Sequence, residues 1–163
     1  MPRVFSGNPI NVDAVRFGIV VSKYHESITG KLLAGATETL IKAGIAENAI
    51  DIAWVPGAWE IPVVAERLVQ CGKYAAVLCL GAVIRGETTH DQHINRQVSL
   101  GLGGLAIRSR IPVLFGLLTC ESMEQAIHRS GGNVGNKGVE CAEAALEMVS
   151  LLRNIDDEYP TRR

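Results

Sequence analysis

Aromatic residues are scarce in this chain of 163 residues: only 5% of its side chains are Phe, Trp or Tyr, although 47% are hydrophobic. The core must therefore be mostly aliphatic, and the position of each aromatic residue becomes informative. The length and the 20% of charged residues suit one globular domain with a sizeable core. We expect a single domain over residues 1–163, with an N-terminal extension at 1–14 and a polar tail at 154–163.

The chain also lacks an excess of charge of either sign, and it lacks long apolar runs. The formal net charge is -1, which gives no electrostatic reason to expect a nucleic acid or an anionic membrane as a partner. The longest apolar run, AAVLCLGAVI, is too short to cross a bilayer, and the N-terminus has no apolar signal sequence. These observations predict a protein with neither a nucleic-acid nor a membrane partner.

The chain has four cysteines but no C-x-x-C pair. Cys79 lies inside an apolar run, where a cysteine behaves as a small buried hydrophobic residue. This usage is typical of a reduced, cytoplasmic chain with no disulfide framework and no thiolate metal site.

Short β-branched apolar segments alternate with segments of helical periodicity. We expect strands at 15–21, 50–55, 75–84 and 111–119. Helices are expected at 28–44, 62–72, 94–105, 122–129 and 139–152, with Gly44 ending the first and Ser122 capping the fourth. Four successive βα units predict an α/β fold of three αβα layers, with a four-stranded parallel sheet of flavodoxin-like topology.

The carboxyl ends of the predicted strands are where a ligand is expected to bind, because α/β sheets hold their ligands at that edge. Four loops meet there, at 22–26, 56–60, 85–90 and 119–121. Two of the few aromatic residues, Tyr24 and Trp59, fall in these loops, which suggests a planar ligand with polar edges. For Trp59, packing of a helix against the sheet is an equally good explanation.

The loop Arg85-Gly-Glu-Thr-Thr-His90 lies between a strand end and a helix start. Unpaired N–H groups at such a helix start hold anions such as phosphate, and Gly86 permits close approach. Taken alone, the loop slightly favours a plain capping turn with Thr89 as the cap. His90 suits proton transfer near neutral pH, whereas a metal pair with His93 lacks a third ligand, so we expect no metal.

The Gly-rich segment SGGNVGNKG, at 130–138, interrupts the last two helices. Segments of this kind are usually only turns. Two cations, Arg129 and Lys137, lie at its ends, and Arg is able to bind a phosphate through two N–H groups. The segment is therefore either a turn or part of a phosphate site.

Several motifs together give a more specific signal. VPGAWEIP, GAVIRGETTH, FGLLT and GNKG occur in the order and spacing of the lumazine synthase family (6,7-dimethyl-8-ribityllumazine synthase), which RFGIVVSKYHESIT also resembles. The similarity runs roughly from Arg16 to Leu152. It implies the penultimate step of riboflavin synthesis, in which 5-amino-6-(D-ribitylamino)uracil condenses with 3,4-dihydroxy-2-butanone 4-phosphate and phosphate and water are released. No metal or organic cofactor is implied.

The resemblance also implies roles for individual residues. Tyr24 takes the place of the stacking aromatic residue, and His90 that of the proton carrier. Glu87 and Thr88 belong to the phosphate-binding turn. The ribityl chain and the heterocycle are implied to contact Ala58, Trp59, Glu60, Ala82, Val83 and Ile84.

The same resemblance implies that the site is shared between subunits. Phe115 is expected to pack against the heterocycle and Arg129 to bind the phosphate, with Lys137 nearby; all three come from the adjacent subunit of a pentamer. The full-length Gly-rich segment favours pentamers that close into a sixty-subunit shell, although Asn133 stands where shell-forming members often have Lys. A free pentamer and a pair of pentamers are the alternatives.

Two departures from the family pattern fall in one loop. Tyr24 stands where Phe or Trp is usual, and His25 stands where Asn is common. They keep open a weakly active paralogue, and a non-catalytic module for flavin or nucleotide is the other alternative. A signalling receiver domain is set aside, because the third strand ends in Ile84-Arg85-Gly86 rather than in a phospho-accepting Asp.

Overall fold

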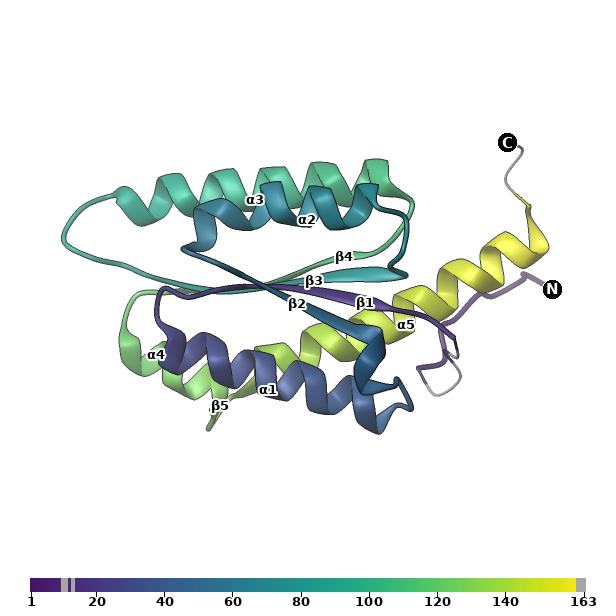
Figure 1. Cartoon of the computed structure of the whole chain (residues 1–163), viewed down its shortest axis with the longest axis horizontal. Coiled ribbons are helices and arrows are strands. Elements are labelled where there is room, and N and C mark those ends of the chain that lie inside the picture. Colours follow the sequence, from purple (N-terminus) through teal and green to yellow (C-terminus); the bar gives the residue numbers. More distant parts are fainter. Residues whose placement is uncertain (10–11, 13, 161–163) are drawn as a thin grey trace.

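The computed structural model describes residues 1–9, 12 and 14–160, and within them a four-stranded sheet lies between two layers of helices (Figure 1). The strands are β1 (Phe17–Ser22), β2 (Ile50–Val55), β3 (Ala76–Ile84) and β4 (Val113–Cys120). Their order in the sheet is β2-β1-β3-β4, and each neighbouring pair is parallel. The predicted flavodoxin-like α/β fold is thereby confirmed.

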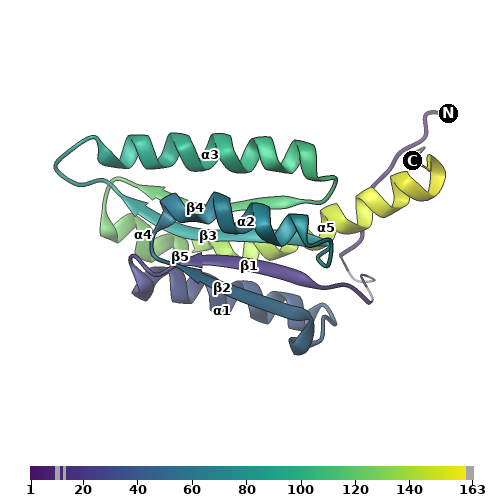
Figure 2. The same cartoon turned by 45° about the horizontal axis from the view of Figure 1, so that its top comes forward.

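Helices cover both faces of the sheet, as Figures 1 and 2 show. One face carries α2 (Ile61–Gln70) and α3 (His90–Ser109), and the other carries α1 (Glu26–Lys42), α4 (Met123–Arg129) and α5 (Lys137–Glu158). Two short 3-10 helices, η1 (Glu47–Ala49) and η2 (Ala58–Glu60), flank β2. Across the residues described, no helix combines the length and the apolar character needed to span a membrane.

Strand β3 is the centre of the core. Its sequence AVLCLGAVI is apolar throughout, and every residue but the last is buried. Leu78 and Leu80 pack toward α1 and α5, while Val77 and Cys79 pack toward α2 and α3. Because side chains alternate between the two faces of a strand, a strand covered on both sides must be apolar at every position.

Local signals place several helix ends where the sequence predicts them. Gly44 follows α1 with a φ of 94°, the left-handed conformation that favours glycine, and its N–H donates to the Ile41 carbonyl at 2.9 Å. The hydroxyl of Ser122 accepts a bond of 3.3 Å from the Gln125 N–H and so caps α4.

The last helix is longer than the sequence predicts. We expect a polar tail from residue 154, but α5 continues to Glu158. The reason is tertiary: the N-terminal segment runs beside α5, where the Asn154 amide donates to the Ser6 carbonyl at 2.9 Å and the Phe5 ring meets the Tyr159 ring at 6.0 Å. Residues 10, 11 and 13 of the expected N-terminal extension, and residues 161–163 of the expected tail, lie outside the described residues.

The Gly-rich segment folds as a small antiparallel hairpin of β5 (Ser130–Gly132) and β6 (Gly135–Asn136), where the sequence analysis expects only a turn or a phosphate site. Gly131 and Gly135 have φ values of 114° and 94°, which disfavour other residues. The Asn136 side chain then accepts from the Gly138 N–H at 2.8 Å and begins α5. The hairpin thus forms the connection between α4 and α5 and sets where α5 begins.

Candidate active site

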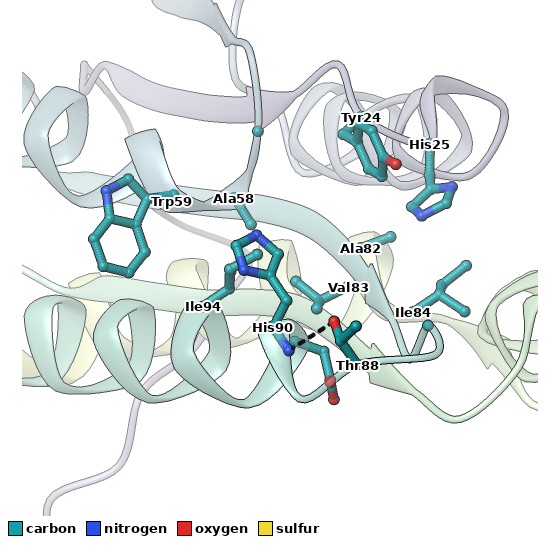
Figure 3. Close-up of a pocket in the computed structure, with 13 residues that line it drawn as sticks. Tyr24, His25, Ala58, Trp59, Ala82, Val83, Ile84, Thr88, His90 and Ile94 are labelled. Carbon is teal, nitrogen blue, oxygen red and sulfur yellow. Dashed lines mark hydrogen bonds between the residues drawn. The ribbon is translucent and has the colours of Figure 1, made fainter.

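A cavity of about 400 Å³ lies at the carboxyl edge of the sheet, beside the ends of β1, β2 and β3 (Figure 3). We call it the first cavity. Eight of the residues predicted from the sequence line it: Tyr24, Ala58, Trp59, Ala82, Val83, Ile84, Thr88 and His90. They come from three loops and one strand end. Because the strands are parallel, their carboxyl ends lie at one edge of the sheet, and the loops that follow them meet there.

Tyr24 and His25 form one wall, at the start of α1. Their rings meet edge to face with centroids 4.6 Å apart, and Tyr24 is 68% exposed, so one ring face remains open for a planar ligand. His25 has a φ of 60°, a left-handed conformation in which Asn and His are both enriched. That requirement explains how His takes a position where Asn is common. Burial lowers the pKa of His25 from its ordinary value of 6.5.

Trp59 forms the facing wall, on the short helix η2 (Figure 3). The Glu60 carboxylate accepts a bond of 2.9 Å from the Gly57 N–H, closing the turn that presents Ala58 and Trp59. Glu60 itself is absent from the cavity lining in the described chain, while Gly57 belongs to it. The observed contact of Glu60 is therefore to its own turn.

The floor of the cavity is the turn between β3 and α3. No hydrogen bond from the N–H groups of residues 86–89 is found in the described part of the chain, so these groups point to solvent or a ligand. Thr89 gives α3 no side-chain cap, whereas the Thr88 hydroxyl accepts a long bond of 3.4 Å from the His90 N–H. Thr89 is thus the N-cap residue of α3, as the plain capping turn predicts, but its hydroxyl makes no capping bond. Glu87 is exposed and does not line the cavity.

His90 begins α3, and Figure 3 shows its ring directed from that helix toward Ala58. In that view the ring lies beside Ala58, Ile94 and Val83, and all four residues line the first cavity. An imidazole in this cavity can carry protons to and from a bound ligand.

The predicted cations lie elsewhere on the chain. Arg129 and Lys137 line a separate second pocket of about 370 Å³, formed by β4, α4 and the start of α5. The Lys137 ammonium is paired with the Glu140 carboxylate at 2.9 Å. Phe115 lines neither of these two pockets and is 41% exposed on β4. The structure therefore separates Arg129 and Lys137 from the first cavity of their own chain, and Phe115 lies in neither pocket.

Five further residues line the cavity. The sequence analysis notes His25 and Gly86, but it does not single out Gly57, Asp91 and Ile94 as ligand contacts. Gly57 carries little signal beyond backbone freedom, and Ile94 reads as a helical core position. Asp91 does carry a sequence signal. It is an acidic residue that directly follows His90 in the first turn of a helix, so it lies close to His90 at the same helix end. Among the described residues, no group of three or more His, Cys, Asp or Glu side chains is arranged to hold a metal ion.

A comparison with protein families agrees with the motifs. The family model described as 6,7-dimethyl-8-ribityllumazine synthase matches residues 14–153, which takes in the whole sheet, the first cavity and the second pocket. The match runs from just before β1 into the second half of α5. By fold, by cavity and by this match, the chain belongs to the 6,7-dimethyl-8-ribityllumazine synthase family and is an enzyme of the condensation step in riboflavin biosynthesis.

Proposed function

We propose that the first cavity is where the chain joins 5-amino-6-(D-ribitylamino)uracil to 3,4-dihydroxy-2-butanone 4-phosphate, with His90 carrying the protons. The observation that carries this proposal is the single cavity in which aromatic rings, a histidine and a turn of unpaired N–H groups meet. Each of the three suits one part of the reactants: the planar ring, the reacting carbons and the phosphate.

The heterocycle lies between the aromatic walls. Tyr24 stacks on it with its open ring face, and Trp59, which is 51% exposed, closes the opposite side. The apolar residues Ala82, Val83 and Ile84 form the base of this slot. Glu60 and Ala58 serve the ribityl chain, Glu60 with the carboxylate oxygen that the Gly57 N–H leaves unbonded.

The phosphate of the second substrate binds the turn at residues 86–89, which includes Glu87 and Thr88. The unpaired N–H groups donate to its oxygens, and the positive end of the dipole of α3 stabilises its charge. The same donors stabilise the phosphate as it leaves, because they are already in place when negative charge develops on it.

His90 moves protons between these two ends. Joining an amine to a ketone expels water, and loss of phosphate from the carbon skeleton requires a proton to leave a neighbouring carbon. A neutral imidazole accepts such a proton and returns it to a departing hydroxyl group near neutral pH. The reaction therefore needs one group that both accepts and returns a proton, placed between the phosphate-binding turn and the slot for the heterocycle.

The cations come from a second subunit. Arg129, Lys137 and Phe115 lie away from the first cavity of their own chain, and a neighbouring copy brings them to it, Arg129 to the phosphate and Phe115 to the heterocycle. Exposed apolar side chains support such an assembly, because Leu100 and Ile107 on α3 are 70% and 87% exposed. We propose pentamers that close into a sixty-subunit shell, in which the hairpin sets the angle between pentamers.

Three experiments test the proposal. The purified protein is incubated with both substrates, and formation of the fluorescent lumazine is followed; no product would refute it. The shared site is tested by co-expressing His90→Ala with Arg129→Ala. Random mixing restores an intact site at about a quarter of positions if the two halves come from different chains, and at none if they come from the same chain. Sedimentation at neutral pH distinguishes the shell from a free pentamer.

We also propose a cytoplasmic location. Cys71, Cys79, Cys120 and Cys141 are all free thiols, which suits a reducing compartment. Fractionation of the source cells, with detection of the protein in the soluble cytoplasmic fraction, tests this.

A further inference from the structure

The turn at residues 86–89 needs support from outside itself. Its four N–H groups are unpaired in the described chain, its residues are all exposed, and its one side-chain bond, from the His90 N–H to Thr88, is long. A turn that binds phosphate through its N–H groups must leave them unpaired, so its rigidity has to come from its neighbours. The question is which neighbours supply it.

Arg85, directly before the turn, connects it to the next strand. Its N–H donates to the Cys120 carbonyl at 2.8 Å, which extends the β3–β4 ladder beyond its last residue pair, Ile84 and Cys120. Its guanidinium also donates to the Glu121 carboxylate at 2.9 Å. Backbone and side chain therefore both fasten the start of the turn to the loop after β4.

Glu121 is itself held in place. Its N–H donates to the Gln125 side-chain oxygen at 2.8 Å, and Gln125 lies in α4, which Ser122 caps. The ion pair thus links the turn of the first cavity to a capped helix rather than to a loose loop. Gln125 lines the second pocket, so this link runs between the two halves of the site on one chain.

A second carboxylate acts on the same arginine. The pKa of the Arg85 guanidinium is raised, first by its hydrogen bond to Glu121, then by the charge of Glu121 and by the charge of Asp91. Asp91 lies in the first turn of α3, and its Oδ1 is buried with no hydrogen-bond partner in the described residues. Two carboxylates therefore influence the Arg85 guanidinium, that of Glu121 on the loop after β4 and that of Asp91 on α3.

We propose that Arg85 and Glu121 are positioning residues that hold the 86–89 turn for the substrate phosphate, and that Arg85 is not itself a phosphate ligand. This inference rests on the proposed function, since it takes the turn to be the phosphate site. Both side chains are more than half exposed, and an exposed ion pair adds little to overall stability. Its effect should therefore be seen in anion binding rather than in the melting temperature.

The test compares Arg85→Gln, Glu121→Gln and the double variant with the parent, using steady-state kinetics for both substrates and competition by inorganic phosphate. The Michaelis constant for the butanone phosphate should rise about two- to fivefold in each single variant. Inhibition by inorganic phosphate should weaken by a similar factor, while kcat and the Michaelis constant for the pyrimidine stay unchanged. The double variant should be no worse than Arg85→Gln alone, because both changes break one link.

Glu38→Gln is the matched control, because it breaks a similarly exposed pair, Glu38 with Lys42 at 2.7 Å, on α1. It should leave both Michaelis constants unchanged. A lower Michaelis constant for the butanone phosphate in Glu121→Gln would overturn the inference, since it would mean that a released Arg85 binds the phosphate. Additive effects in the double variant, or no change in any variant, would overturn it too. A parent protein that forms no lumazine would refute the proposed function instead.

Discussion

The first cavity and the second pocket differ in what each offers a ligand. Among the described residues, the first cavity presents Tyr24 and Trp59, two histidines and unpaired N–H groups, but no Lys or Arg side chain. In the part of the chain that the structure describes, the second pocket presents Arg129 and Lys137 but no Phe, Trp or Tyr side chain. The proposed reaction, with a planar ring and a phosphate, uses both sets of groups. The proposal therefore brings the second pocket of one chain to the first cavity of another.

The largest expected effect comes from replacing His90, the proposed proton carrier of the first cavity. His90→Ala should lower kcat by up to about a hundredfold, the low end for acid–base catalysis, because several steps of such a condensation proceed without a catalyst. Binding of both substrates should survive. The rate is measured against pH, with His93→Ala, on an exposed position of the same helix, as the control. A variant whose turnover matches the parent at every pH would remove His90 from its role.

The second prediction breaks the framework of the second pocket. A Cβ added to Gly138 would lie 1.9 Å from the Leu32 carbonyl oxygen, so Gly138→Ala forces α5 away from α1. The free energy of unfolding should fall by about 1–3 kcal/mol. Gly30→Ala is the control, because no atom lies within 4 Å of its added Cβ, and it should be neutral or stabilising. Chemical denaturation measures both, and equal stabilities would contradict the close approach.

Some parts of the fold can be predicted from the sequence, and others cannot. Strand β3 and the edge at which the ligand binds follow from patterns along the chain, because a strand buried on both faces must be apolar and parallel strands end at one edge. The hairpin and the end of α5 depend on distant partners instead. The Asn136 amide donates to the Lys31 carbonyl at 3.0 Å, and Asn154 meets Ser6. No local pattern contains those pairs.

The same limit applies to the site. Three of the four predicted loops, with Tyr24, Trp59 and His90, meet at the first cavity, as their places at strand ends predict. The fourth loop contributes Thr119 to the second pocket instead. The separation of Arg129 and Lys137 from the first cavity depends on the distances between loops in the folded chain, which the order of residues does not give. Arg129 falls on the far side of β4, and only the resemblance to a family indicates a neighbouring subunit for it.

The third prediction concerns Tyr24, whose exposed ring lies in the wall of the first cavity. Tyr24→Ala should weaken binding of the pyrimidine or the lumazine by about 1–3 kcal/mol, the range measured for stacking of a base on an aromatic side chain. Tyr24→Trp should bind at least as well as the parent, because it restores a larger ring. Fluorescence titration with the lumazine measures both. Parent-like binding by the Ala variant would assign the stacking role to Trp59.

The fourth prediction concerns the second pocket and has a smaller effect. Arg129→Lys keeps the charge but loses the planar fork that grips two phosphate oxygens. Loss of one charge-assisted hydrogen bond should raise the Michaelis constant for the butanone phosphate about tenfold and leave that for the pyrimidine unchanged. Steady-state kinetics with each substrate varied in turn measures this. An equal rise for both substrates would make Arg129 a structural residue.

The smallest effect concerns His25, the titratable residue in the wall of the first cavity. Burial lowers its pKa in the folded chain, so on acidification the unfolded chain takes up a proton near pH 6.5 while the folded chain takes it up only at lower pH. The unfolded state therefore binds more protons in that window, and the free energy of unfolding falls as the pH drops below about 6.5. His25→Asn removes this term and keeps a residue that tolerates the φ of 60°. Denaturation at about pH 8 and about pH 5, at one protein concentration, should show a smaller loss for the variant than for the parent. Equal losses would mean that the His25 imidazole is as well solvated in the folded chain as in the unfolded one.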